Sequence, residues 1–344
     1  MSAPANVVAF LPLKGAVLDP IAPYSTVHLQ YSIEAGSPRL LDFQPDLTRI
    51  AAAMSRVPDA ELELPPDGYQ DLELLSLFPF LRRLGIKSPP GTDFSGMRHV
   101  PNLLSLRVST DTPFHFLGFI PRLQSLTITG SHSGLVLESV PGLEYLKIQD
   151  FTGALSPRFW TGCPRLKHLS LLNGKVGPLP VLTTLQSLEL QALRGLEDWS
   201  FLPRLSTLRW LAISRQKQML ALPALRGLDS LYKVTLGEMK NLVDLSPLLD
   251  LPNLRSVSLF DMRHISPTQL DPVRSHPTLR EFEFVTTNPK LDKRINAYVN
   301  LPRPTVIEGV DLSTPPIEIP VADEFDQWLR NRSYNLQPIP RLNR

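Results

Sequence analysis

The segments PRLQSLTI (121–128), PGLEYLKI (141–148), PRLKHLSL (164–171) and PNLRSVSL (252–259) are copies of one pattern, Leu-x-x-Leu-x-Leu. Ten clear copies follow one another at spacings of 19 to 25 residues. Their first leucines are Leu81, Leu103, Leu123, Leu143, Leu166, Leu185, Leu208, Leu231, Leu254 and Leu279. A weaker copy, AELEL (60–64), precedes them. Such a period indicates a repeat architecture, in which each unit buries its apolar side chains only against its neighbours.

Each copy contains the alternation typical of a short strand. In x-Leu-x-Leu-x the two leucines point to the same side, because successive strand residues face opposite sides. Seven copies also carry proline two residues before the first leucine, where it ends the preceding segment and starts the strand. These prolines are Pro79, Pro101, Pro121, Pro141, Pro164, Pro252 and Pro277. The pattern predicts about 10 short parallel strands that share one apolar side.

The composition excludes several classes of protein. The chain has 344 residues, among them 62 leucines and 35 prolines, with a formal net charge of +2. This much leucine with so little net charge excludes a disordered chain. A single cysteine, Cys163, excludes a disulfide scaffold and a cysteine-ligated metal site. No apolar run approaches the roughly 20 residues that cross a bilayer, and we expect a cytoplasmic protein.

On these repeats the chain resembles leucine-rich repeat proteins over residues 57–287. The segments LVDLSPLLDLPNLRSVSL (242–259) and EDWSFLPRLSTLRWLAI (197–213) are similar to the short-repeat subclass of internalins and phosphatase-regulatory subunits. The resemblance implies an α/β solenoid of 10–11 repeats, with a concave parallel sheet and short 3₁₀ or extended convex segments. The asparagine or cysteine that many members place after the strand is absent. We therefore expect other groups to satisfy the backbone of these turns.

The two ends of the chain lack the repeat. Residues 1–56 are expected to form an N-terminal cap, with a strand over 25–34 and a short helix over 46–56 that begins at Asp46 as N-cap. Residues 288–344 are rich in proline and are expected to form an extended C-terminal cap or tail, with a short helix near 323–332. A tail that binds a partner is the alternative for this segment.

The sequence offers no catalytic constellation. It has no nucleophile elbow and no H-E-x-x-H motif, and its seven histidines show no metal-ligand spacing. Cys163 precedes a predicted strand, where a buried thiol fills space. We therefore expect no enzymatic activity, no metal and no cofactor.

The surface left for function is the concave face of the sheet, formed by the strand residues that alternate with the leucines. Its first half is expected to be basic and its second half acidic, which would steer a charged partner. Aromatic side chains among small residues are typical of binding hot spots. The candidate partner-binding residues are Arg83, Lys87, Arg107, Tyr145, Lys147, His168, Glu189, Trp210, Phe260, Glu281 and Glu283.

These observations favour a monomeric, non-enzymatic scaffold that binds a folded protein or a peptide on this face. An inhibitor, an immunity protein or an adaptor would fit, and the family resemblance implies protein recognition. Binding of a nucleic acid or a glycan by the basic and aromatic residues Arg83, Arg107, Tyr145 and Lys147 is the alternative. Nucleic acid is less favoured because the net charge is only +2.

Overall fold

The structure is a computed structural model. It describes residues 8–12, 26–30, 44–56, 60–64, 71–89, 91–110, 113–130, 135, 137–152, 154–155, 157–160 and 162–303. The tail beyond residue 303 and the helix expected near 323–332 lie outside the described residues. The chain divides into two compact units, Met1–Arg165 and Leu166–Arg344, and each is described by itself. This division does not test the domain boundaries expected from the sequence.

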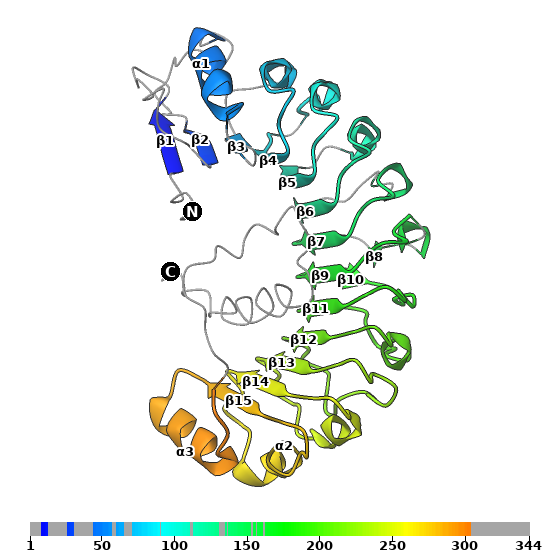
Figure 1. Cartoon of the computed structure of the whole chain (residues 1–344). Coiled ribbons are helices and arrows are strands. Elements are labelled where there is room, and N and C mark those ends of the chain that lie inside the picture. Colours follow the sequence, from blue (N-terminus) through cyan, green and yellow to red (C-terminus); the bar gives the residue numbers. More distant parts are fainter. Residues whose placement is uncertain are drawn as a thin grey trace. The chain divides into compact units, whose positions relative to one another are not determined.

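The first unit is built on parallel strands that pair in chain order from β1 to β7. Short 3₁₀ helices connect the later strands (Figure 1). The strands are β1 (Val8–Pro12), β2 (Thr26–Gln30), β3 (Glu61–Leu64), β4 (Arg83–Lys87), β5 (Ser105–Thr110), β6 (Ser125–Gly130), β7 (Tyr145–Gln149) and the short β8 (Ala154–Leu155). The helices are α1 (Gln44–Met54), η2 (Glu73–Leu77), η3 (Ser95–His99), η4 (His115–Phe119), η5 (Leu137–Ser139) and η6 (Pro157–Trp160).

The second unit repeats this plan. Its strands pair in parallel in the order β9, β11, β12, β13, β14 and β15. The strands are β9 (His168–Leu172), β10 (Lys175–Val176), β11 (Ser187–Gln191), β12 (Trp210–Ser214), β13 (Lys233–Gly237), β14 (Ser256–Phe260) and β15 (Glu281–Val285). The helices are η7 (Leu202–Arg204), η8 (Ser246–Asp250), η9 (Pro267–Leu270), α2 (Asp271–Arg274) and α3 (Pro289–Val299).

The predicted repeat is confirmed in both units. Each of the ten clear copies forms a strand that begins two residues after its first leucine, as in Leu123 before β6 and Leu254 before β14, and the weaker copy forms β3. All ten first leucines are buried, together with the two apolar strand residues that follow, which are leucine, isoleucine or valine in nine copies and Phe282 and Phe284 in the last. The parallel strands and the short 3₁₀ segments between them give the α/β leucine-rich repeat fold that the sequence predicts.

Backbone hydrogen bonds replace the missing asparagine ladder. In the second unit the residue after strand β9 and after each strand from β11 to β14 has a left-handed conformation, with φ between 48° and 55°. Its N–H donates to the last carbonyl of the next strand, as from Ala192 to Ser214 at 3.0 Å and from Glu238 to Phe260 at 2.8 Å. The turn backbone therefore continues the sheet by one hydrogen bond, and no particular side chain is needed there.

An aspartate starts several of the convex turns. Asp93, Asp198 and Asp244 each accept a hydrogen bond at 2.8 Å from the backbone N–H two residues later. Hydrogen bonds to the backbone and side chain of that serine lower the pKa of all three carboxyls. The recurring Asp-x-Ser is thus the local stop signal that separates the strand from the 3₁₀ segment.

The ends differ from expectation in three respects. Strand β1 (Val8–Pro12) precedes the one strand that was expected in residues 1–56. Helix α1 begins at Gln44, so Asp46 lies inside its first turn and the prediction of Asp46 as N-cap is wrong. Helix α3 occupies a segment expected to be extended. Asn288 caps it by accepting from the N–H of Leu291 at 3.3 Å. Its Asn296 accepts from Phe284 N–H at 3.0 Å and donates to Phe284 O at 2.8 Å, which satisfies backbone groups of strand β15.

Candidate functional site

The candidate surface is the side of each unit's strands that faces away from the leucine core. We call it the polar face, and it consists of the first, third and fifth residues of strands β3–β7 in the first unit and of β9 and β11–β15 in the second. Strand register aligns these residues in rows. In the second unit one row runs from Ser187 through Trp210, Lys233 and Ser256 to Glu281. All predicted site residues belong to one of these two faces.

The polar face of the first unit is less basic than the sequence analysis predicts. Strand β3 pairs with β4 and adds Glu61 and Glu63 to this face. Arg107 forms ion pairs with both, at 2.7 Å between its Nη2 and Glu61 Oε1. The expectation of a basic first half counted only the clear copies, and the weaker copy AELEL adds the two acids that reduce its charge. Of the other predicted residues, Lys87 is exposed, and Arg83 and Lys147 are half-buried.

The hot-spot argument assumed that the aromatic and histidine side chains are exposed, but three of them are buried. Tyr145 and His168 are buried, and Trp210 is only 1% exposed. The indole N–H of Trp210 donates to Thr235 Oγ1 at 3.2 Å, which holds the ring against strand β13. The expectation of exposed rings is thus corrected, and whether these residues contact a partner stays a prediction.

The polar face of the second unit contains a set of buried residues, most of them polar, that includes Trp210. We call it the Trp210 cluster, and its members are Trp210, Lys233, Thr235, Ser256, Ser258 and Glu283. Ser258 lies between Thr235 and Glu283 in the strand register. Three of its buried atoms have no hydrogen-bond partner among the described residues, namely Ser256 Oγ, Ser258 Oγ and Glu283 Oε2. These atoms lie on the neighbouring strands β14 and β15.

Burial changes the acidity of the cluster. Burial raises the pKa of Glu283 above its ordinary value, although the positive charges of Arg303 and Lys233 act in the opposite direction. The carboxylate has lost water without gaining a full set of hydrogen bonds, so its ionised form is disfavoured. The cluster therefore holds a carboxyl group that a donor from outside the cluster would stabilise.

The remaining predicted residues divide between buried and accessible positions. Glu189 is buried and accepts a hydrogen bond from Ser170 Oγ at 2.5 Å. Glu281 and Phe260 are half-buried. Val285, beside Phe260 in the register, is 36% exposed. Phe260 and Val285 form an apolar row at the ends of β14 and β15, next to the Trp210 cluster.

The structure offers little to nucleophilic or metal chemistry. Burial, followed by the charge of Glu138, raises the pKa of Cys163 to about 12, so the thiol is protonated at neutral pH. Within the described ranges, no three histidine, cysteine, aspartate or glutamate side chains gather as metal ligands would. In the same part of the chain, no helix has the length and apolar character needed to cross a membrane.

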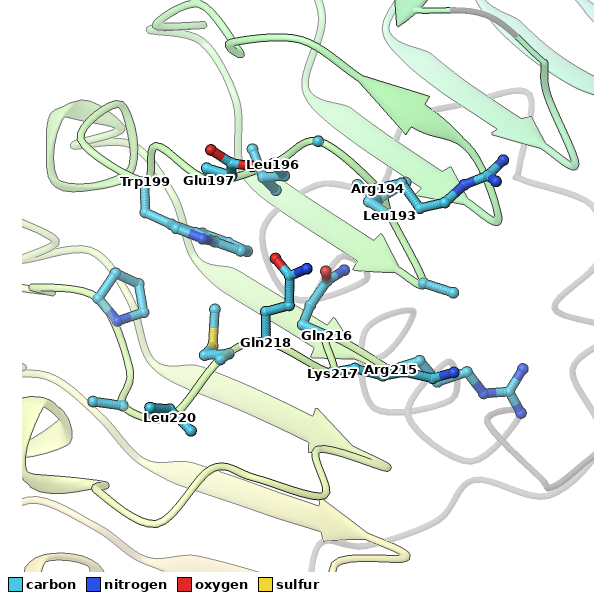
Figure 2. Close-up of a pocket in the computed structure, with 15 residues that line it drawn as sticks. Leu193, Arg194, Leu196, Glu197, Trp199, Arg215, Gln216, Lys217, Gln218 and Leu220 are labelled. Atoms are coloured by element: carbon cyan, nitrogen blue, oxygen red, sulfur yellow. The ribbon is translucent and has the colours of Figure 1, made fainter.

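The sequence analysis missed a pocket of about 760 Å³ in the second unit (Figure 2). Two loops form it, residues 192–199 after β11 and residues 215–223 after β12. These loops fall between the leucine repeats, and their residues show no periodic pattern that could have predicted a cavity. The only signal in the sequence is that these two loops carry Trp199 and the basic residues Arg194, Arg215 and Lys217.

Comparison with known proteins supports the fold and goes no further. No protein-family model matches the chain, and no curated protein matches it. Among solved structures, the Drosophila Toll–Spätzle complex is similar at 15% identity with a TM-score of 0.52, over 81% of this chain and 43% of that one. An internalin, InlF, from Listeria monocytogenes matches at 16% identity with a TM-score of 0.47, over 70% and 77%. A leucine-rich repeat protein of Leptospira interrogans, LIC12759, matches at 15% with 0.43, over 81% and 89%.

Proposed function

We propose that this leucine-rich repeat protein is a non-enzymatic interaction scaffold that binds a folded protein or a peptide through the polar face of its second unit. The observation that carries the proposal is the apolar row of Phe260 and Val285 beside the unpartnered atoms of the Trp210 cluster. Exposed apolar side chains on a sheet otherwise made of small and polar residues are typical of an interface centre. Repeats of this fold serve as extended binding surfaces.

The unpartnered atoms support the same conclusion on energetic grounds. A buried polar atom without a partner destabilises a protein by about 1–3 kcal/mol, and such atoms are few in native structures. A protein ligand that brings donors to Glu283 and to the serine hydroxyls recovers part of this loss. Local departures from good packing are expected mainly at functional positions.

A protein partner is favoured over a nucleic acid. The basic residues that would contact phosphate belong to the first unit, where Glu61 and Glu63 already pair with Arg107. On the second unit's polar face, Glu281 and Glu283 would repel phosphate. We further propose that the protein acts as a cytoplasmic monomer, as an inhibitor, an immunity protein or an adaptor.

The test uses side chains that can be changed without opening the core. Trp210→Ala and Tyr145→Ala are poor first choices, because both side chains are buried. Phe260→Ala combined with Val285→Glu removes the apolar row, and Leu249→Ala on η8 is a matched control at a residue 47% exposed. Tagged versions of each protein are used to purify partners, and each partner is then titrated in purified form by calorimetry.

We expect a partner that binds the wild type and Leu249→Ala with equal affinity. The same partner should bind the double variant at least about tenfold more weakly, which corresponds to about 1.4 kcal/mol of binding free energy. Circular dichroism checks that all three proteins are folded to the same extent. If every partner binds the double variant at full strength, the polar face of the second unit is not the binding surface.

A further inference from the structure

The pocket in Figure 2 is a second candidate binding site, separate from the polar face. Its volume of about 760 Å³ lies in the range of about 300–1,000 Å³ that is usual for ligand sites. All of its lining residues come from the two loops, and none from the strands β11 and β12. It is therefore formed by residues other than those of the polar face.

The walls of the pocket are fixed by hydrogen bonds. The side-chain amide of Gln216 bonds to both backbone groups of Leu193. Its nitrogen donates to Leu193 O and its oxygen accepts from Leu193 N–H, each at 3.2 Å. This pair joins one loop to the other. On its far side, the second loop is held by the N–H of Val243, which donates to Leu220 O at 3.0 Å. A pocket held in this way loses little conformational entropy when a ligand binds.

One end of the pocket is apolar. Figure 2 shows Trp199 and Leu220 at this end, with the amides of Gln216 and Gln218 between them and the arginines. Leu220 is 64% exposed, the largest value among the exposed apolar residues of the described chain. The ring of Trp199 stacks on Phe201 with a centroid separation of 6.2 Å and is half-buried. Its indole N–H donates no hydrogen bond within the described residues, so both the ring and the donor are available to a ligand.

The other end is basic. Arg194 and Lys217 are exposed, and neither side chain forms an ion pair within the part of the chain that the structure describes. Arg215 is held in place by Glu238, with 2.7 Å between its Nη2 and Glu238 Oε1 and 2.8 Å from its Nε. A guanidinium has five N–H donors, so Arg215 keeps donors for a ligand. Glu197 is the one acid among the lining residues.

We propose that this pocket binds an acidic peptide segment of a partner protein, with an aliphatic or aromatic side chain against Trp199 and Leu220 and carboxylates at Arg194, Arg215 and Lys217. Arginine binds carboxylates through paired N–H donors. The aliphatic residues at the rim favour a peptide over a nucleotide, which would need more cations around its phosphates.

The test measures fluorescence anisotropy of two labelled hexapeptides, one with the sequence EDLFED and one with the sequence KKLFKK. We expect EDLFED to bind at least about tenfold more tightly than KKLFKK. Arg194→Glu combined with Lys217→Glu changes only exposed side chains, and it should weaken binding of EDLFED about tenfold or more. Trp199→Ala should do the same, and Trp199→Phe should restore most of the affinity.

Two controls separate this site from the polar face. Leu249→Ala and the double variant of Phe260 and Val285 should bind EDLFED as the wild type does, so this proposal can fail or hold independently of the proposed function. The proposal is overturned if neither peptide binds at about 1 mM, if KKLFKK binds as tightly as EDLFED, or if the Arg194 and Lys217 variant binds unchanged. Preferential binding of a labelled ten-nucleotide thymidine strand to the same residues would also overturn it.

Discussion

The polar faces of the two units differ in whether their charged groups have partners. In the first unit Arg107 lies between Glu61 and Glu63, and the charges of these three residues compensate one another. In the second unit Glu283 is buried with one oxygen that lacks any hydrogen-bond partner, and Ser256 and Ser258 are buried beside it in the same condition. The first unit also has buried atoms without partners, Arg83 Nε and Ser125 Oγ, but no unpartnered carboxylate oxygen among its described residues.

This difference has a consequence for function. Paired charges mainly hold a structure in one arrangement, whereas unpartnered buried groups lower its stability. A face that keeps such groups next to exposed apolar residues is better suited to binding than to stabilising the fold. The comparison predicts that breaking the ion pairs of the first face destabilises the protein, and that replacing the unpartnered groups of the second face does not.

The largest effect should come from Trp210, the packing centre of the second face. Trp210→Ala removes a fully buried ring and should lower the free energy of unfolding by about 3–5 kcal/mol. Trp210→Phe keeps most of the ring and loses the hydrogen bond to Thr235, so about 1–2 kcal/mol is expected. Urea denaturation followed by circular dichroism measures both. A loss below about 1 kcal/mol for Trp210→Ala would mean that the ring is not packed as described.

Arg107→Met should have the next largest effect, because it leaves Glu61 and Glu63 facing each other without a cation. We expect a loss of about 2 kcal/mol, below the value for a fully buried pair since Arg107 is partly exposed. Adding Glu61→Gln and Glu63→Gln to the same chain should restore most of the stability. If the triple variant is no more stable than Arg107→Met, the ion pairs do not explain the loss.

Ser258→Ala and Thr235→Val sharpen the comparison within the Trp210 cluster. Thr235 accepts the hydrogen bond of Trp210, so Thr235→Val should destabilise the protein by about 1–2 kcal/mol. Ser258 has no partner, so Ser258→Ala should change the unfolding free energy by less than about 0.5 kcal/mol, or increase it. The midpoint temperatures of thermal unfolding show which variant is less stable. A lower midpoint for Ser258→Ala than for Thr235→Val would contradict the assignment of hydrogen-bond partners.

The smallest effect concerns the pH dependence of Glu283. Because burial raises its folded-state pKa, the folded state holds this proton more tightly than the unfolded state. The contribution of Glu283 to stability is thus complete at low pH and is lost as pH rises through the folded-state pKa. Glu283→Gln should therefore be more stable than the wild type at pH 7, with the difference shrinking as pH falls toward 4. Equal differences at both pH values would exclude this titration.

The leucine pattern predicted the strands well because each repeat uses only local rules. The repeat signal spans only eight residues, which include the proline, the first leucine and the alternation after it. A strand lies at each clear copy of this pattern. Helix α3 was not predicted, because it lies in the proline-rich segment 288–344, for which only a later helix near 323–332 was expected. Its own Pro289 lies in the first turn of the helix, where proline is well tolerated. The pair of Asn296 with Phe284 could not be predicted, because the two residues belong to different elements.

The sequence by itself determined the fold, the position of the ten repeat strands and the polar-face residues on them, because period and alternation are properties of the chain. The tertiary structure decided which of those residues are accessible. It paired Arg107 with Glu61 and Glu63 across strands, buried Trp210 against Thr235, left Phe260 and Val285 partly exposed, and brought two loops together around Trp199. Burial and pairing depend on neighbours that are 20 or more residues away, which a local pattern does not contain.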